Sequence, residues 1–390
     1  MNNKKILIVY PHNFLQGLHG TNMNIYQLTK IFKELNYDVD LFAYEGFTPD
    51  SDFSNFKEQN KDRLVNKLYV YDFRKSKKMN KTSIINKIKN KIKSKTEKHL
   101  QDWTNYEIQN YFDKVTSDNK YDDVIITYSY LANLIVKTKN KISYKKIYYM
   151  IDSMFLQQYS WDKKINKNLT LGKLMDEELE RLKYFDKFLC VSNDEKIFYE
   201  KLLEKKMHFI PHFSDNKGYE LKPLHKRRWD VFFIGFDNPF NVEGLNWFLD
   251  EVYPYLDKNL KILLVGTSTN KINNSYSNVD IIQYAPSLDE IFENVKISIC
   301  PMFRGTGIKI KVVESMENGL PVVCTERGVD GLPDKTECGC LVTEDAKEFA
   351  GYINKLTSDD NFYNEVSEKI KNYYKKIFDR EKYKNKLKSI

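Results

Sequence analysis

The residues best suited to chemistry gather in one segment, residues 300–332, where glycines, basic side chains and a glutamate lie close together. Three cations and two glycines follow an apolar run there: Arg304, Gly305, Gly307, Lys309 and Lys311. Glycines between a strand and a helix let the backbone approach a ligand, and the first turn of the helix offers free N–H groups. The helix dipole contributes only about 0.3–1 kcal/mol, so cations usually supplement it. The pattern therefore predicts an anion site, and a diphosphate suits it.

Glu314 lies two turns into the helix predicted over residues 308–318. A carboxylate there could take paired hydrogen bonds from the diol of a ribose, as acids do in dinucleotide-binding folds. A glycine-rich loop before a helix also fits a simple tight turn, and Glu314 also fits a solvated residue or an ion-pair partner. The residues by themselves leave these alternatives open.

The elements that must position this segment are short strands alternating with helices, a pattern typical of parallel sheets built from βαβ units. The pattern pauses at a linker over residues 210–229, which holds two prolines and a glycine, and then restarts. Helices are predicted over residues 21–35 and 242–255, besides the one over 308–318. Strands are predicted over residues 4–10, 38–44, 67–73, 122–128, 146–151 and 187–192, and then over 230–235, 261–266, 279–284, 297–301 and 321–325.

Composition bounds the class of protein. The chain has 390 residues, of which 41% are apolar and 14% aromatic, and this argues against disorder. The net charge of +8 belongs to the first half, because residues 1–210 hold 37 basic and 27 acidic side chains. This excess is too mild to indicate a nucleic-acid binder. Five cysteines without zinc-ligand spacing, and no long apolar segment, predict reduced thiols in a cytoplasmic protein without a metal site.

The segment from Pro301 to Leu332 resembles the signature of the group 1 nucleotide-sugar glycosyltransferases, which have the GT-B fold. The resemblance is good over residues 230–345, and residues 233–248 are similar to the start of the second domain of that family. The positions that match the signature are Gly305, Gly307, Lys311, Glu314, Met316, Gly319, Pro321, Val322 and Val323.

The resemblance implies an α/β fold with two Rossmann-like domains facing one another across a cleft. We expect an acceptor-side domain over residues 1–212 and a nucleotide-sugar-binding domain over residues 228–365. Residues 366–390 would form C-terminal helices that pack back on the first domain. Members of the family typically transfer a sugar with retention and without a metal, so no cofactor is expected beyond the nucleoside diphosphate sugar that serves as donor.

The resemblance also implies roles for single residues. Lys311 would neutralise the diphosphate leaving group and Glu314 would hold the ribose, whereas Gly266 and Tyr284 would lie at strand ends that face the nucleotide. The remaining donor-binding residues would contact phosphate or sugar: Arg304, Gly305, Thr306, Gly307 and Lys309.

Two departures from the family pattern change the expected distribution of charge. Many relatives carry an acid eight residues before the equivalent of Glu314, and here that position is Thr306. Many also place basic residues in the loop after the first strand of the second domain, and residues 236–243 hold none. The phosphate charge should therefore fall more heavily on the three cations around the glycine loop.

The first half gives weaker indications of a site. Gly17 and Gly20 follow the first strand, where the family has a glycine loop facing the cleft, although a tight turn explains them equally well. Asp152 follows the fifth strand, where many relatives carry a His-Asp pair or an acid near the reacting sugar, and Ile151 stands in place of the histidine. We expect a catalytic role for Asp152, and an N-cap is the alternative.

The basic stretch over residues 74–98 contains eleven Lys and Arg side chains and one acid. Its isoleucines recur at helical spacing, which predicts a basic amphipathic helix that meets an anionic membrane surface. A helix that docks its isoleucines on the domain is the competing interpretation. Nucleic acid is disfavoured, since no aromatic residue lies within the stretch.

The sequence thus predicts a glycosyltransferase that moves a sugar from a nucleoside diphosphate to a growing glycan or lipid-linked acceptor. Synthesis of a bacterial surface polysaccharide or glycoconjugate is the expected setting, with the protein cytoplasmic and peripheral on the inner face of the membrane. The alternative is a non-catalytic GT-B subunit that positions a partner transferase, motivated by the missing first acid. A GT-B sugar-nucleotide epimerase is a third option, but the cleft acids and histidines that it uses have no clear place here.

Overall fold

A computed structural model describes residues 3–16, 20–75, 99–162, 170–213, 221–272, 276–285 and 287–389. The chain forms two compact units, each with its own parallel sheet. Unit 1 comprises Met1–Pro211 together with Glu381–Ile390, and unit 2 comprises His212–Arg380. The prediction of two α/β domains with parallel sheets is confirmed.

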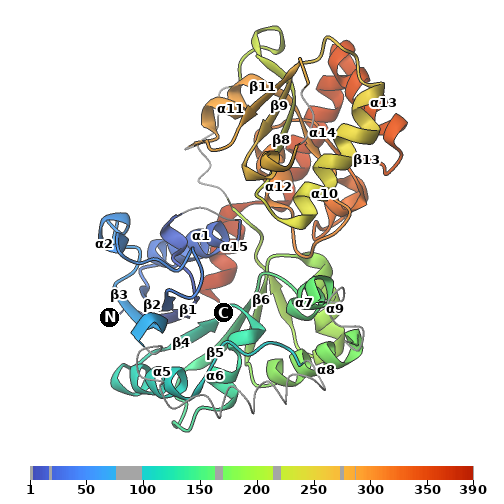
Figure 1. Cartoon of the computed structure of the whole chain (residues 1–390). Helices are drawn as coiled ribbons and strands as arrows, with labels where there is room; N and C mark the ends of the chain where they lie inside the picture. The colour runs from blue at the N-terminus through green and yellow to red at the C-terminus, as the bar shows by residue number, and fades with distance from the viewer. Residues whose placement is uncertain are drawn as a thin grey trace. The chain divides into compact units, whose positions relative to one another are not determined.

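The sheet of unit 1 has seven parallel strands in the order β3-β2-β1-β4-β5-β6-β7 (Figure 1). The first strand lies between the second and the fourth, with Ile8 opposite Leu41 on one side and Ile125 on the other. The strands are β1 (Lys5–Val9), β2 (Asp38–Glu45), β3 (Lys67–Asp72), β4 (Asp123–Ile126), β5 (Lys145–Met150), β6 (Lys187–Cys190) and β7 (Met207–Phe209).

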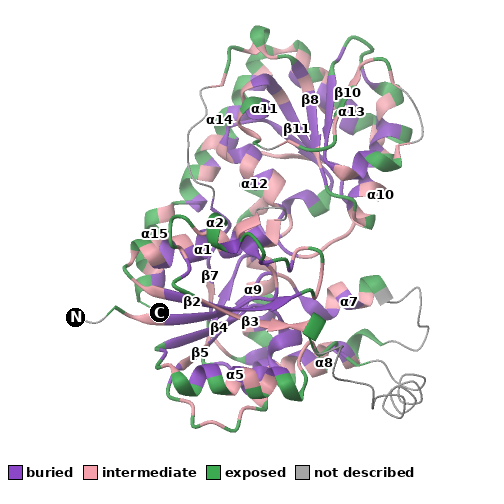
Figure 2. Cartoon of the chain, turned by 60° about the vertical axis from the view of Figure 1, so that its left-hand side comes forward, coloured by how far each residue is buried: buried purple, intermediate pink, exposed green. Residues whose placement is uncertain are grey.

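The central strands of unit 1 are continuous apolar runs because helices cover both faces of a parallel sheet. Ile6, Leu7 and Ile8 have no exposed surface. Figure 2 shows these strands as the buried interior, with the exposed residues on the surrounding helices. Those helices are α1 (Gly20–Glu34), α2 (Phe56–Gln59), α5 (Tyr106–Asp118), α6 (Asn133–Val136), α7 (Met154–Asp162), α8 (Leu171–Leu182) and α9 (Asn193–Leu203).

The last helix, α15 (Arg380–Lys388), also packs in unit 1. The Tyr383 ring lies with its centroid 5.8 Å from that of Phe209, and the Lys384 Nζ lies 3.3 Å from the Glu34 carboxylate. The return to unit 1 begins at residue 381, later than the expected residue 366. The reason is that α14 (Asp360–Ile377) packs on unit 2, where Ser367 Oγ donates a hydrogen bond to the Gly319 carbonyl.

The sheet of unit 2 has six parallel strands in the order β10-β9-β8-β11-β12-β13. They are β8 (Trp229–Ile234), β9 (Ile262–Val265), β10 (Val279–Ile282), β11 (Val295–Cys300), β12 (Val322–Cys324) and β13 (Leu341–Val342). Besides α14, the helices are α10 (Pro239–Trp247), α11 (Asp289–Asn294), α12 (Ile310–Glu317) and α13 (Ala346–Ser358).

Both sheets share one topology, in which the first strand of the unit pairs with the second on one side and the fourth on the other. The order of the strands reverses at this point, and ligands of such folds bind there, outside the carboxyl ends of the strands. The topology therefore marks one place in each unit: the ends of β1 and β4 in unit 1, and the ends of β8 and β11 in unit 2.

Among the described helices, none is both long and apolar enough to cross a membrane.

Candidate active site

The strand-order reversal of unit 2 brings two helices together. The chain leaves β8 and enters α10, whose first turn is capped by Asn238, because its side chain accepts hydrogen bonds from the amides of Phe240 and Asn241. The chain leaves β11 through a loop at residues 301–309 and enters α12. The first turns of both helices thus begin beside neighbouring strand ends, where free N–H groups favour an anion.

The loop before α12 depends on its two glycines. Gly305 and Gly307 have φ angles of +117° and +68°, which side chains other than glycine rarely adopt. The loop delays the start of α12 to Ile310, two residues later than predicted, and Lys309 stays extended as the N-cap residue. The Nζ of Lys309 donates hydrogen bonds to the carbonyls of Thr306 (3.2 Å) and Gly307 (3.0 Å). The Lys309 ammonium therefore stabilises the conformation of the loop in this structure.

Lys311 reaches from α12 to α10. Its Nζ donates a hydrogen bond of 2.9 Å to Asn241 Oδ1 and lies 4.7 Å from the centroid of the Phe233 ring. Burial lowers the pKa of the Lys311 ammonium, and the charge of Lys309 lowers it further. A half-buried cation with one neutral hydrogen-bond partner has donors left for an anionic oxygen, and an anion would relieve its desolvation.

Glu314 follows Lys311 by three residues, a spacing that puts both side chains on one face of the helix. Burial and the nearby Glu317 raise the pKa of Glu314 to about 7, and Lys311 opposes this shift. Within the described part of the chain its carboxylate has no hydrogen-bond partner. A half-buried carboxyl group with unused acceptors, one turn from a half-buried lysine, can take hydrogen bonds from a sugar diol.

Arg304 is not the free cation that its place in the sequence suggests. Its Nε and Nη2 donate two hydrogen bonds of 2.7 Å to the carboxylate of Glu243, on α10. This pairing raises the pKa of the Arg304 guanidinium, and 42% of its side chain is exposed. Since Glu243 balances the Arg304 charge, Arg304 has less positive charge to offer an anion than its place in the sequence suggests.

Gly266 and Tyr284 follow the two strands beyond β8. Gly266 has a φ of +100°, and a Cβ added to it would lie 2.2 Å from the carbonyl oxygen of Gly235, directly after β8. Only glycine allows this approach of two strand ends. Tyr284 follows β10 and is 71% exposed, so its ring is open to solvent. Gly266 lies next to the reversal point, and Tyr284 lies one strand further out.

The predicted residues of unit 1 are only partly described. Gly17 lies outside the described residues, and Gly20 is the first residue of α1. Asp152 follows β5, and two tyrosines, Tyr10 and Tyr128, follow β1 and β4. Burial, followed by the negative charge of Asp152, raises the pKa of Tyr128. The acid thus lies close to the strand-order reversal of unit 1.

Sequence reasoning missed the partners that come from distant segments. Asn241 and Glu243 lie 70 and 61 residues before the lysine and the arginine that they bind. Ser192, two residues after β6, caps α9 by accepting a hydrogen bond from the Glu195 amide. The Asn-Pro pair at residues 238–239 is the sequence feature that could have helped, because it marks the start of α10. Asn241 and Glu243 both lie near that start.

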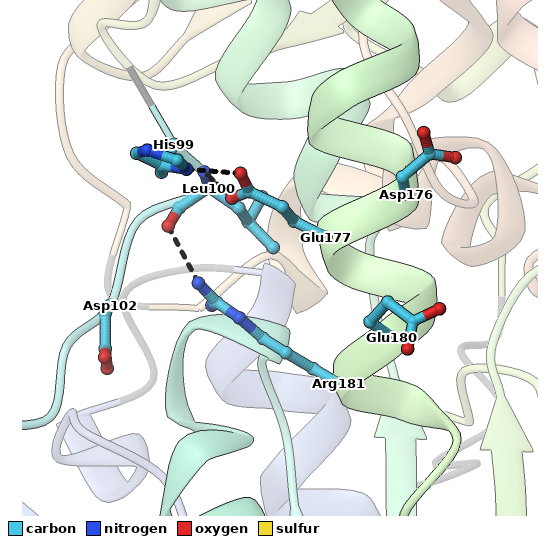
Figure 3. A pocket seen from close by; sticks show the side chains of 7 residues that line it. All are labelled: His99, Leu100, Asp102, Asp176, Glu177, Glu180 and Arg181. Atoms are coloured by element: carbon cyan, nitrogen blue, oxygen red, sulfur yellow. Dashed lines mark hydrogen bonds and ion pairs between the residues drawn. The ribbon is translucent and has the colours of Figure 1, made fainter. Parts of the chain in front are cut away.

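A cavity of about 480 Å³ lies elsewhere in unit 1, between α8 and the segment at residues 99–102 (Figure 3). None of the predicted site residues lines it. Among the described residues, no group of three or more His, Cys, Asp or Glu side chains could hold a metal ion.

The family comparison concerns unit 2. Residues 228–359 match the protein family described as "Glycosyl transferases group 1". Over the whole chain, an uncharacterized 44.6 kDa protein in the cps region of Klebsiella pneumoniae is 24% identical over 402 residues, with 97% of each chain covered.

The similar solved structures extend over both units. Sucrose-phosphate synthase from Thermosynechococcus elongatus has a TM-score of 0.68 at 13% identity, covering 99% of this chain and 98% of that one. Anabaena HepE, solved in complex with UDP and glucose, has a TM-score of 0.67 at 12% identity, with both chains covered completely. At such identities these matches establish the GT-B fold alone.

Proposed function

Because this chain is a group 1 glycosyltransferase with the GT-B fold, we propose that it transfers a sugar from a nucleoside diphosphate sugar to a glycan or lipid-linked acceptor. We propose a surface polysaccharide or glycoconjugate as the product. The relative encoded in the cps region of Klebsiella pneumoniae supports this setting, and the HepE complex with UDP and glucose supports a nucleotide donor.

One observation carries the proposal: Lys311 and Glu314 occupy one face of α12, behind a glycine loop at the strand-order reversal of unit 2. A nucleoside diphosphate needs one group for its phosphates and another for its ribose. In our proposal Lys311 and the first-turn amides of α12 bind the diphosphate, and Glu314 accepts hydrogen bonds from the ribose hydroxyls.

The reaction follows from these contacts. The acceptor hydroxyl oxygen bonds to the anomeric carbon, and the bond from that carbon to the β-phosphate oxygen breaks. The electron pair stays on the departing nucleoside diphosphate, which also takes up the hydroxyl proton when transfer proceeds with retention. Lys311 stabilises the negative charge that develops on the leaving group, a role that preorganised cations fill without a metal. Asp152 acts on the acceptor side of the reacting sugar.

Turnover of a defined donor tests this proposal. The purified full chain is incubated with UDP-, GDP- and dTDP-sugars, and release of the nucleoside diphosphate is measured with and without EDTA. We expect release from one class of donor, unchanged by EDTA, and its loss in Lys311→Ala and Glu314→Ala. Lys369→Ala is the matched control, since Lys369 pairs with Glu365 on the exposed face of α14.

Two outcomes would contradict the proposal: full activity in both α12 variants, or activity that needs a divalent cation. Donor binding without any turnover, in the presence of a range of acceptors, would instead favour the non-catalytic subunit.

We also propose that the protein is cytoplasmic and meets the inner face of the membrane through the basic stretch over residues 74–98. Residues 76–98 lie outside the described residues, so their sequence alone supports this proposal. Flotation with vesicles of neutral and of anionic phospholipid tests it. We expect binding only with anionic lipid, because each lysine near such a surface contributes about 1 kcal/mol. Equal flotation with both vesicles, or none, would contradict it.

A further inference from the structure

Unit 1 contains a buried carboxyl group that the proposed reaction does not use. Glu178, on α8, has no exposed surface. Burial raises the pKa of the Glu178 carboxyl, and the hydrogen bonds that it accepts oppose this shift. Burying a carboxyl group without partners costs several kcal/mol, so a partnered one at a core position indicates a specific structural task.

The hydrogen bonds of Glu178 lead to the turn after β5. Its Oε2 accepts a hydrogen bond of 2.9 Å from the Phe155 amide, in the first turn of α7. The same oxygen accepts one of 3.0 Å from the Tyr199 hydroxyl, on α9. The Tyr199 hydroxyl in turn lies 2.8 Å from Ser153 Oγ. One carboxyl group thus fixes the backbone at residue 155 directly and the side chain at residue 153 through a tyrosine.

Asp152 immediately precedes this fixed turn. Ser153 and Tyr199 are buried, so the hydrogen bond between them is shielded from water. A shift of the turn by a fraction of an ångström would move the Asp152 carboxylate by a similar amount. Misplacement by about 1 Å can cost about 100-fold in rate even when the change lies far from the reacting atoms.

A second residue of α8 also fixes neighbouring segments of unit 1 through hydrogen bonds. Arg181 donates hydrogen bonds to the carbonyls of Leu100 (2.8 Å), Gln101 (2.6 Å) and Ser129 (3.0 Å). Figure 3 shows Glu177 and Arg181 extending from α8 towards residues 99–102. Ser129 directly follows Tyr128, just as Ser153 directly follows Asp152. The helix α8 therefore anchors the segments after both β4 and β5.

We propose that Glu178 is a positioning residue that orients the Asp152 carboxylate through the Phe155 amide and the Tyr199–Ser153 pair. This inference rests on the proposed function, in which Asp152 acts at the reacting sugar. Glu178 touches no substrate and exchanges no proton with it. Its task is to keep the turn after β5 in one conformation.

Kinetics of single and double variants test the proposal. In Tyr199→Phe the hydroxyl that links Glu178 to Ser153 is absent, and in Glu178→Ala the Phe155 amide also loses its partner. We expect kcat to fall about tenfold or more in both variants, with the donor KM nearly unchanged, because the turn rather than the donor site moves. Glu178→Gln should retain most of kcat, since the amide oxygen can accept the same two hydrogen bonds.

A matched control comes from the amino ends of the strands in the same sheet. Tyr121, just before β4, donates a hydrogen bond of 2.8 Å to the buried Asp40. Tyr121→Phe removes a comparable buried tyrosine–carboxylate bond at the amino ends of the strands, so it should lower the melting temperature without the selective loss in kcat.

The double variant separates positioning from general destabilisation. With Asp152→Asn as background, Tyr199→Phe should cause almost no further loss in kcat, because the residue that it positions no longer acts. Independent losses that multiply would overturn the proposal, as would a wild-type kcat in a folded Glu178→Ala protein. If Asp152→Asn itself keeps full activity, the catalytic assignment of Asp152 fails first and the inference fails with it. Loss in Asp152→Asn but not in Tyr199→Phe would refute the inference alone.

Discussion

The two units have the same strand order, yet the residues at their strand-order reversals differ in chemistry. In unit 2 the reversal carries a glycine loop with positive φ angles, the half-buried Lys311 and a carboxylate with unused acceptors. In unit 1 it carries two buried tyrosines and an acid, with Tyr10 donating a hydrogen bond of 2.6 Å to Asn22. Topology thus fixes the place where each unit can bind a ligand, whereas the few residues after each strand determine the chemistry of that place.

The two units also differ in net charge. Residues 1–210 carry a net charge of +10, whereas unit 2, residues 212–380, holds 21 basic and 26 acidic side chains and carries −5. Its cations act locally, since Arg304 is balanced by Glu243 and Lys309 is engaged by loop carbonyls. The proposed anion site therefore depends on the position of Lys311 more than on the net charge of unit 2.

The largest effect should come from Lys311→Ala. Loss of the Lys311 ammonium should lower kcat/KM for the donor by about 100- to 1000-fold, since in our proposal it stabilises the departing diphosphate. Initial rates of nucleoside diphosphate release measure this, and circular dichroism checks the fold. A loss in kcat/KM no greater than that in Lys369→Ala would contradict the role of Lys311 and, with it, the proposal that unit 2 binds the donor.

Asp152→Asn should give the next largest effect, with a different signature. We expect kcat to fall about 10- to 100-fold while the donor dissociation constant stays within about twofold, because the acid belongs to unit 1. Calorimetric titration of the donor, alongside kinetics, measures the two quantities separately. Weaker donor binding in this variant would mean that the units do not divide the substrates as proposed.

Glu314→Gln should alter the dependence of stability on pH. The pKa of Glu314 is raised to about 7 in the folded protein, above its unfolded value, so the folded state binds more protons between about pH 4.5 and 7. Its contribution to the free energy of unfolding is therefore present at acid pH and is lost as pH rises towards 7. The glutamine variant should be the more stable protein at pH 8, by an amount on the order of 1–3 kcal/mol.

Thermal unfolding of both proteins from pH 5 to 8, without donor, measures this difference. Glu365→Gln, on the exposed surface of α14, serves as the control. A constant difference between wild type and Glu314→Gln across the range would contradict the raised pKa.

The smallest effect should come from Arg304→Ala. Because Glu243 already balances the guanidinium, we expect a loss in donor affinity of about threefold or less. Arg304→Ala with Glu243→Gln removes both partners and should behave like the wild type. A loss comparable to that of Lys311→Ala would show that the ion pair opens when donor binds.

Much of the fold could be predicted from the sequence because its strands are long apolar runs. The strands β1 and β8 lie within one residue of their predicted ends. The strands β7 and β13 escaped prediction because they have only three and two residues, too few for a periodic pattern. The start of α12 was predicted two residues early, since nothing local marks Lys309 as extended.

The site could be predicted only as far as local spacing reaches. Lys311 and Glu314 lie three residues apart on one helix, so their common face follows from helical geometry alone. The pairing of Arg304 with Glu243 depends on how α10 packs beside the loop after β11, and no local pattern encodes that contact. The roles of Lys311, Glu314 and Asp152 stay predictions, and so does the part played by Gly17 and the stretch over residues 74–98.

The return of α15 to unit 1 bears on the order in which the protein folds during synthesis. Unit 2 is one continuous segment, residues 212–380, and can fold as soon as that segment has left the ribosome. Unit 1 waits for residues 381–390, which supply the packing on Phe209 and the ion pair with Glu34. Unit 1, most of which is synthesised before unit 2, is therefore the unit that completes its fold last.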